Sequence, residues 1–252
     1  MIDLHTVATP NGHKVSIMLE EVGLPYTVIP YNIFAGDQFK PEFLLLNPNN
    51  KLPVIVDNEP LGGGEPFAVF ESGAILAYLA DKTGQLWPRE ARQRHTVLQW
   101  LMFQMAGLGP MHGQAHHFIR YAPERQEYST TRYLQEARRL LRVMDQRLAQ
   151  TEYLAGSDYS IADIACWPWI RATRLISIDL QDYAQLQRWF RVIAQRPAVA
   201  RGGSVIDDSV KTRPASGKVA LDAAQWSALF GARQHATDSE TIACAQLAPR
   251  QA

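Results

Sequence analysis

Pro53 stands at the start of an apolar run, Pro53-Val54-Ile55-Val56, and follows the turn-forming cluster Asn47-Pro48-Asn49-Asn50. This placement predicts a strand that begins at the proline, because proline has no N–H to donate from a strand interior. A cis Leu52-Pro53 bond would turn the backbone of Leu52 outward, where its N–H and C=O could pair with an extended ligand. The alternative is an ordinary trans proline, which is far more common, since about 5–6% of X–Pro bonds in folded proteins are cis.

The composition is typical of a folded, soluble protein. A chain of 252 residues, 46% of them hydrophobic, can bury the core of one large domain or two modest ones. The 25 basic and 25 acidic residues cancel, so no overall field draws the chain to nucleic acid or anionic lipid. The first residues, Ile2-Asp3-Leu4, lack the charged start and long apolar run of a signal peptide, and no stretch reaches roughly 18 apolar residues. We therefore expect a cytoplasmic protein with neither nucleic acid nor membrane as a partner.

The cysteines and histidines predict no metal site and no redox-active dithiol. Cys166 and Cys244 lie far apart and form no Cys-x-x-Cys motif. Cys166 lies in an apolar run, which favours a packed small side chain over a nucleophile. His116 and His117 are adjacent, so on a helix they would point about 100° apart and form a poor pair of ligands.

The first eighty residues alternate between strand and helix patterns. The expected order is strand, helix, strand, helix, strand, strand, helix, with strands over 2–7, 26–30, 53–56 and 67–70 and helices over 15–22, 41–46 and 72–82. Gly62-Gly63-Gly64 is interpreted as a tight hairpin turn, because it lacks the spacing and the lysine of a phosphate-binding loop. This order predicts a thioredoxin-like α/β domain.

Long helical patterns dominate the second half of the chain. Helices are expected over 96–118, with a break near Gly107 and Gly109-Pro110, and over 128–150 and 186–193. Ser160-Ile161-Ala162-Asp163 has the form of a capping box before an apolar, buried helix. Beyond Gly202 we expect one short amphipathic helix near Trp226 and little independent structure after Ala236. The prediction is a thioredoxin-like domain over 1–83, an all-α domain over 90–202 and an extension over 203–252.

Several motifs in this order resemble those of cytosolic glutathione transferases, over roughly residues 1–200. Glu71-Ser72-Gly73-Ala74-Ile75 is similar to the Glu-Ser signature that opens the third helix of that family, and Asn49-Asn50-Lys51-Leu52-Pro53 to its cis-proline loop. Ser160–Asp163 is similar to its core capping motif. Three further stretches resemble the bacterial Nu class more narrowly, namely Thr9–Lys14, Gly109-Pro110-Met111 and Asp163–Trp169. Enzymes of this class are glutathione-dependent disulfide-bond reductases related to the yeast nitrogen-catabolite prion regulator.

The resemblance implies an enzyme that takes glutathione as its cosubstrate and reduces disulfides. It also implies reduction of organic hydroperoxides, weak transfer of glutathione to electrophiles, and a homodimer. Because the chain has no dithiol of its own, bound glutathione must supply the reacting sulfur. The alternative is a glutathione-binding regulatory module without significant turnover. The physiological second substrate cannot be named from the sequence.

Glutathione is a γ-glutamyl peptide with an ammonium, two carboxylates and a thiol, and the resemblance assigns residues to each part. Glu71 would pair with the ammonium, while Ser72, free backbone N–H groups and the helix dipole would receive the γ-glutamyl carboxylate. The backbone of Leu52 would pair with the cysteinyl amide by strand addition. The alternative for Glu71 and Ser72 is an ordinary helix cap.

Three further side chains are implied less strongly. Gln38 would contact the other end of the peptide, Lys51 ranks below it as a second contact, and Arg132 would reach into the neighbouring subunit's site. The alternative for Gln38 and Arg132 is a solvated side chain.

Thr9 and Asn11 take the place of the tyrosine, serine or cysteine that many relatives carry after the first strand. By resemblance they donate hydrogen bonds to a glutathione sulfur at a helix N-terminus. Such a position can lower a thiol pKa from about 8.5 toward or below neutrality, and the thiolate is the form that attacks a disulfide. The alternative is that both residues form an ordinary helix cap.

Overall fold

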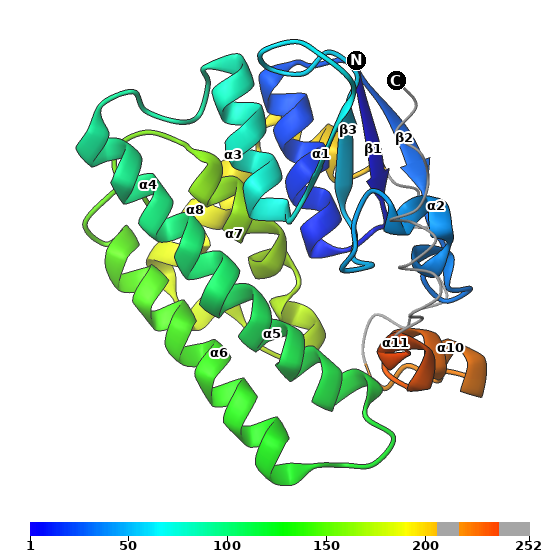
Figure 1. Ribbon diagram of the computed structural model, residues 1–252. Helices are drawn as coiled ribbons and strands as arrows, with labels where there is room; N and C mark the ends of the chain where they lie inside the picture. The colour runs from blue at the N-terminus through cyan, green and yellow to red at the C-terminus, as the bar shows by residue number, and fades with distance from the viewer. Residues whose placement is uncertain (206–216, 237–252) are drawn as a thin grey trace.

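The computed structural model describes residues 1–205 and 217–236 of the chain (Figure 1). A mixed four-stranded sheet forms the N-terminal part, and a bundle of helices packs beside it. The predicted fold class, a thioredoxin-like domain joined to an all-α domain, is confirmed. The exact domain limits remain a prediction.

The sheet has the strand order β2-β1-β3-β4. The central strand β1 (Ile2–Thr6) runs parallel to β2 (Tyr26–Pro30) and antiparallel to β3 (Val54–Asp57), and β4 (Phe67–Phe70) completes the hairpin with β3. Leu4 on β1 lies between Val28 and Ile55 and is fully buried. The expected hairpin is therefore confirmed. The connection between the two strands runs over residues 58–66, so it is longer than the tight turn predicted. Gly62, Gly63 and Gly64 lie within it, and all three have positive φ.

Two helices fill the space between the sheet and the bundle. α1 (Pro10–Val22) begins at the capping residue Thr9 and ends at Gly23, whose φ of 69° is the left-handed conformation that glycine adopts readily. α3 (Ser72–Thr83) starts at the same end of the sheet and packs against α1 (Figure 1). The short helices η1 (Asp37–Phe39) and α2 (Pro41–Leu44) follow β2.

The bundle is built from longer helices, and the expected break near Gly107 is present. α4 (Ala91–Phe103) passes through the π-helical turn η2 (Gln104–Leu108) into α5 (Gly109–His116) and a second π-helical turn, η3 (His117–Tyr121). The remaining helices are α6 (Glu127–Leu148), α7 (Ile161–Arg171), η4 (Thr173–Ile176), η5 (Leu180–Asp182), α8 (Ala184–Ala194), α9 (Pro197–Gly202), α10 (Ala223–Leu229) and α11 (Ala232–His235). α10 is the predicted amphipathic helix. The segment after Ala236 lies outside the described residues.

The buried helix α7 is held at its start by the predicted capping box. Ser160 Oγ accepts from the backbone N–H of Ala162, and Asp163 Oδ2 accepts from the N–H of Ser160 at 3.0 Å. The other Asp163 oxygen accepts from Leu154 N at 3.0 Å and from Trp189 Nε1 at 2.8 Å. A fully buried carboxylate is tolerated when its oxygens are satisfied in this way.

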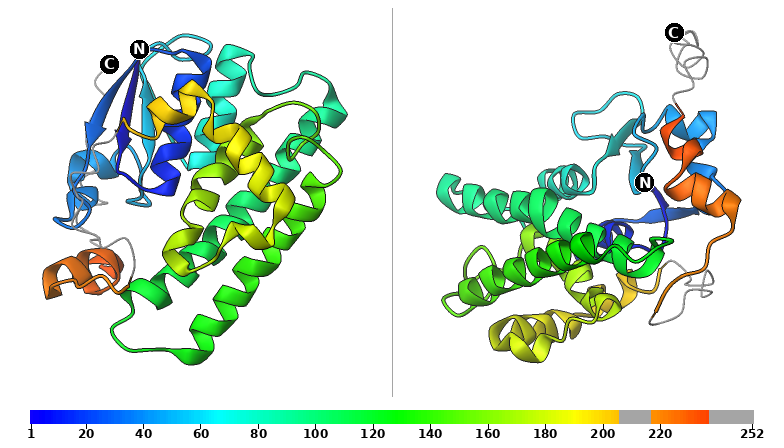
Figure 2. Two further views of the ribbon diagram at one scale, coloured as in Figure 1. Left: turned by 180° about the vertical axis from the view of Figure 1, so that it is seen from behind. Right: turned by 90° about the horizontal axis from the view of Figure 1, so that it is seen from below.

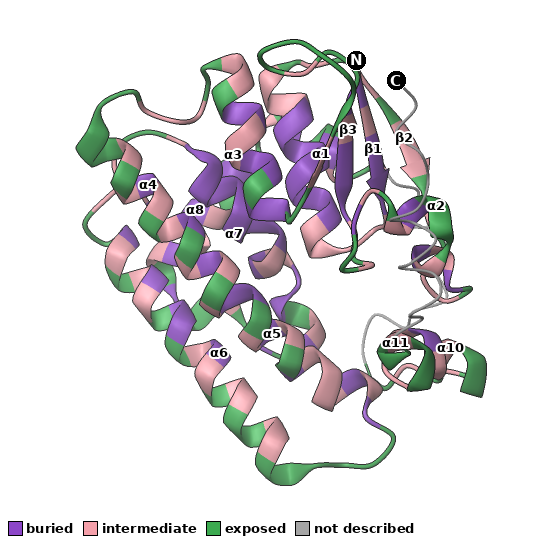
Figure 3. Cartoon of the chain, viewed as in Figure 1, coloured by how far each residue is buried: buried purple, intermediate pink, exposed green. Residues whose placement is uncertain are grey.

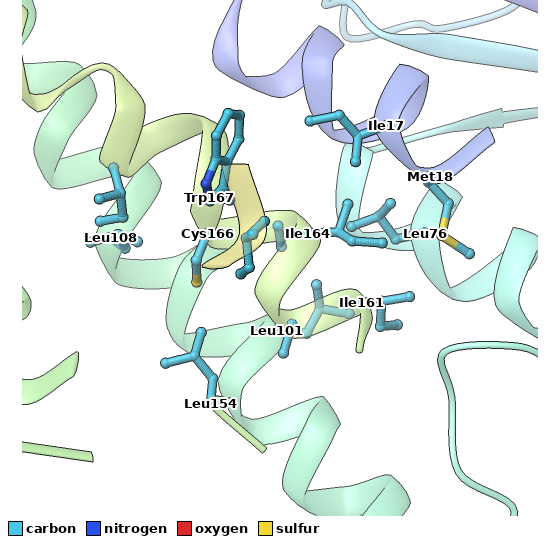
Figure 4. Packing of buried hydrophobic residues seen from close by; sticks show 14 of the residues in the cluster. Ile17, Met18, Leu76, Leu101, Leu108, Leu154, Ile161, Ile164, Cys166 and Trp167 are labelled. Atoms are coloured by element: carbon cyan, nitrogen blue, oxygen red, sulfur yellow. The ribbon is translucent and has the colours of Figure 1, made fainter. Parts of the chain in front are cut away.

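The core is continuous across the two halves of the molecule. Buried residues concentrate on α1, α3 and α7 and on β1 and β3 (Figure 3). Cys166 belongs to the apolar cluster drawn in Figure 4, together with Leu108, Leu154 and Ile164. Burial raises the pKa of its thiol well above the usual value. Cys166 is thus a packed side chain, as predicted, while Cys244 lies outside the described residues.

Within the part of the chain that the structure describes, no helix is both long enough and apolar enough to cross a membrane.

Candidate functional site

A cavity of about 880 Å³ opens between the N-terminal domain and the helical bundle. Its lining comes from the loop after β1, the loop after β2, the proline loop, the ends of α5 and α7, and α10–α11. The predicted site residues among its lining are Thr9, Asn11, Gln38, Lys51 and Leu52. This size matches that of small-molecule sites.

Thr9 and Asn11 are brought to the cavity by the turn between β1 and α1. Thr9 has an extended backbone, and its Oγ1 accepts from Gly12 N at 3.3 Å, so it caps the helix. Asn11 Oδ1 accepts from Trp169 Nε1 at 3.0 Å, which holds the amide in place. The amide NH₂ group is then the part of Asn11 that can donate to a ligand. Thr9 is therefore the helix cap of the alternative interpretation, whereas the Asn11 oxygen pairs with Trp169. The capping role of Thr9 does not exclude contact with a ligand.

Leu52 lines the cavity just before β3, and the Leu52-Pro53 peptide bond is cis. The loop that carries it is braced from within. Asn47, which is buried, donates from Nδ2 to the carbonyl of Lys51 at 2.7 Å and accepts from Asn49 N at 2.9 Å. The cis alternative for Pro53 is therefore the one that the structure adopts.

Glu71 and Ser72 form the N-terminal end of α3, outside the lining of this cavity. Glu71 has φ 69° and ψ 114°, and its exposed side chain makes no capping hydrogen bond. An unfavourable backbone conformation of this kind costs about 1–3 kcal/mol and tends to occur at functional sites. Ser72 is buried, and its hydroxyl accepts from Lys14 Nζ at 3.1 Å. Neither side chain acts as the ordinary helix cap that was the alternative.

Lys14, the last residue of the Thr9–Lys14 motif, contacts the start of α3, and no role was predicted for it. Its side chain is 1% exposed, and its ammonium group contacts Ser72 Oγ, Gln104 Oε1 at 2.5 Å and Met105 Sδ at 3.4 Å. Burial lowers the pKa of Lys14 to about 7, partly offset by Cys166 and Glu71. The sequence does hold a signal of its burial, because this lysine stands beside Val15 on an otherwise apolar face of the helix.

Gln38 is buried, at 4% exposure, and so is not the solvated side chain of the alternative interpretation. Its Nε2 donates to the carbonyls of Ile33 and Ala228, each at 3.3 Å. Its Oε1 has no hydrogen-bond partner among the described residues. A buried carbonyl oxygen without a partner is costly, so a ligand N–H at this point would be stabilising.

Arg132 is not brought to this cavity. It is exposed on α6 and lines a separate groove of about 430 Å³ with Tyr128, Glu136, Arg139 and Arg142. A contribution of Arg132 to a neighbouring subunit's site stays a prediction.

The wall of the cavity carries more positive than negative charge. Lys51, Arg120, Arg171 and Arg174 are its cationic side chains, and Asp37 is an acidic one. Arg171 lies 2.9 Å from His13 Nδ1, which fixes its guanidinium near the start of α1. Such a wall suits an anionic ligand. No cluster of metal-ligating side chains occurs in residues 1–205 and 217–236.

Comparison with known proteins identifies the family. The model of the glutathione S-transferase N-terminal domain matches residues 8–82, and that of the C-terminal domain matches residues 127–192. The chain belongs to the glutathione S-transferase family. The resemblance drawn from the motifs is thereby confirmed.

Three relatives of this glutathione S-transferase are informative. The disulfide-bond oxidoreductase YfcG of Escherichia coli is 50% identical over 201 residues, which cover 80% of this chain and 94% of the relative. A glutathione transferase family member from Pseudomonas fluorescens, solved with two glutathione molecules bound, is 46% identical with a TM-score of 0.76, covering 80% of this chain and 92% of that one. A glutathione transferase from Pseudomonas putida, solved with one glutathione disulfide per subunit, is 43% identical with a TM-score of 0.76, covering 81% and 91%.

Proposed function

We propose that this glutathione S-transferase reduces disulfide bonds with the thiol of bound glutathione. The observation that carries the proposal is the cavity at the start of α1, where Thr9, Asn11 and Leu52 converge. The one described cysteine, Cys166, is buried in the core and has a raised pKa, so it is unsuited to nucleophilic attack. The name of the Escherichia coli relative supports the same reaction.

The binding model follows the chemistry of the peptide. Glu71 pairs with the ligand ammonium, and Ser72 with the start of α3 receives the γ-glutamyl carboxylate. The backbone of Leu52 pairs with the cysteinyl unit, and Gln38 with Lys51 contacts the glycyl end. The positively charged wall described above balances the ligand carboxylates. The glutathione complexes of the two Pseudomonas relatives support glutathione as the cosubstrate.

The chemistry is two successive thiol–disulfide exchanges. Thr9, Asn11 and the N-terminus of α1 stabilise the glutathione thiolate, which attacks one sulfur of the substrate disulfide. The S–S bond breaks, a mixed disulfide with glutathione forms, and the released thiolate takes up a proton. A second glutathione thiolate attacks the mixed disulfide and releases the second substrate thiol. Two glutathione thiols are oxidised to one glutathione disulfide, and one substrate disulfide is reduced to two thiols.

The proposal includes the finer expectations drawn from the resemblance. The same thiolate would reduce organic hydroperoxides and transfer weakly to electrophiles. The protein would work in the cytoplasm as a homodimer, with Arg132 of each subunit contributing to its neighbour's site.

Steady-state kinetics with two substrates tests the reaction type. We expect kcat/KM for glutathione-dependent reduction of hydroxyethyl disulfide to exceed kcat/KM for conjugation of chloronitrobenzene by at least about tenfold. The opposite order would assign an ordinary conjugating transferase. Glutathione binding without turnover of either substrate would assign the regulatory module.

A further inference from the structure

The helices α10 and α11 lie near α2 and the end of α5, outside the residues that either family model matches (Figures 1 and 2). Leu229 of α10, Phe230 directly after it and Gln234 of α11 belong to the cavity lining. We call the segment 217–236 the C-terminal cap. The role inferred below for this cap, in selecting the disulfide substrate, rests on the proposed disulfide reduction.

The C-terminal cap is attached to the N-terminal domain by polar contacts. The carbonyl of Ala228 accepts from Gln38 Nε2, and Gln234 Nε2 donates to Asn50 Oδ1 at 3.3 Å. Arg233 lies over the ring of Phe39 at 5.1 Å and donates to the carbonyl of Ala35 at 3.4 Å. The cap therefore covers the loop and the glutamine that are assigned to the glycyl end of glutathione.

The same segment is attached to the helical bundle by aromatic contacts. The ring of Phe230 lies 4.6 Å from that of His117 and 5.3 Å from that of Tyr121, and Trp226 lies 6.1 Å from His117. Ring contacts at these separations stabilise the packing of the cap against the bundle beyond the effect of their buried area. Val219 N also donates to the carbonyl of Arg120 at 2.8 Å. The cap thus bridges the two domains on that side of the cavity.

We infer that the C-terminal cap is a size filter, with Phe230 as a specificity-determining residue, which restricts the second substrate to small disulfides and excludes those on folded proteins. A protein disulfide must bring its surrounding surface to the glutathione sulfur, and the bridged side of the cavity obstructs that approach. A small, flexible disulfide fits within about 880 Å³. The surplus of positive charge on the wall favours small disulfides that carry carboxylates.

Two substitutions in the full chain loosen the cap in different ways. Phe230→Ala removes the ring that contacts His117 and Tyr121. Arg233→Ala removes the contacts with Ala35 and Phe39 and does not change a residue of the cavity lining. Leu61→Ala is the matched control, because Leu61 is an apolar side chain, 58% exposed, in the turn between β3 and β4.

The measurement is the ratio of kcat/KM for hydroxyethyl disulfide to kcat/KM for serum albumin that carries a glutathione mixed disulfide. We expect this ratio to fall by at least about tenfold in both cap variants, through faster reduction of the albumin, and to stay unchanged in Leu61→Ala. If hydroxyethyl disulfide is reduced but neither cap variant changes the ratio, the size filter is wrong and the proposed function stands. If the unsubstituted chain reduces no hydroxyethyl disulfide, the proposed function fails and the size filter fails with it.

Discussion

The ammonium group of Lys14 donates to the hydroxyl of Ser72, with 3.1 Å between Nζ and Oγ. The contact joins α1, whose start carries Thr9 and Asn11, to the start of α3. Ser72 Oγ accepts this hydrogen bond and donates its own proton to Met105 Sδ at 3.7 Å. Because a thioether sulfur is a weak acceptor, a ligand carboxylate would compete well for that proton. Lys14 therefore acts as a positioning residue behind the proposed γ-glutamyl site.

Lys14→Met should weaken binding of S-methylglutathione by at least about tenfold, because it removes both the hydrogen bond that orients Ser72 and the positive charge behind the ligand carboxylate. A hydrogen bond to a charged group contributes roughly 1.5–3 kcal/mol. S-methylglutathione is used because it lacks the thiol and so reports binding alone. Isothermal titration calorimetry provides the dissociation constant. Lys82→Met is the control, since Lys82 lies at the far end of α3 and pairs with Asp57 of β3. Equal affinities in the Lys14 variant and the unsubstituted chain would remove Lys14 from the site.

The affinity for S-methylglutathione should fall as the pH rises past neutrality. Burial lowers the pKa of Lys14 to about 7, so the side chain is charged below that pH and loses its proton above it. A bound carboxylate favours the charged form, and binding is therefore strongest on the acid side. Lys14→Met should flatten this part of the profile between about pH 6 and 8.5, and an unchanged pH profile in the variant would contradict the assignment.

Thr9→Ala combined with Asn11→Ala should lower kcat for disulfide reduction by at least about a hundredfold while S-methylglutathione still binds. The two side chains act on the sulfur, so their loss raises the thiol pKa and lowers the thiolate fraction. Loss of the Thr9 cap also costs about 1 kcal/mol of stability. Thr9→Ser keeps the cap and the hydroxyl and should retain most activity. Unchanged turnover in the double variant would contradict this assignment.

Glu71→Gly should stabilise the fold and weaken the site. Glycine adopts φ near 69° without the penalty that glutamate has there, which favours the folded state by about 1 kcal/mol. Loss of the carboxylate should raise the dissociation constant of S-methylglutathione at least about tenfold. Glu71→Gln keeps the strained backbone and removes the charge, so it should weaken binding without stabilising the protein. Thermal unfolding and calorimetry measure the two effects separately.

Asp163→Ala should destabilise the protein by about 3 kcal/mol or more, because it leaves the buried N–H groups of Ser160, Leu154 and Trp189 without their acceptor. Asp158→Ala removes an exposed carboxylate nearby and should change the free energy of unfolding by less than about 0.5 kcal/mol. Urea unfolding compares the two variants. A small effect of Asp163→Ala would show that these donors find other partners.

The parts of the fold that local patterns determine were predictable from the sequence. The strand that follows Pro53, the capping box at Ser160 and the break near Gly107 each depend on residues close together in the chain. The positions of Thr9, Asn11 and Leu52 beside one cavity followed from the family resemblance rather than from periodicity.

The features that depend on distant contacts were not predictable. The burial of Lys14 requires Ser72 on another helix and Gln104 from the bundle. The docking of α10 on Gln38 joins residues that are 190 positions apart. The positive φ of Glu71 is imposed by the junction of β4 and α3, and neither neighbour in the sequence marks it.

The central claim is that glutathione, and no cysteine of the protein, supplies the reacting sulfur. The most direct test is the rate of glutathione-dependent reduction of hydroxyethyl disulfide by a chain that carries both Cys166→Ala and Cys244→Ser. We predict a kcat/KM within about threefold of that of the unsubstituted protein. A folded double variant whose rate fell to that of glutathione alone would contradict the claim.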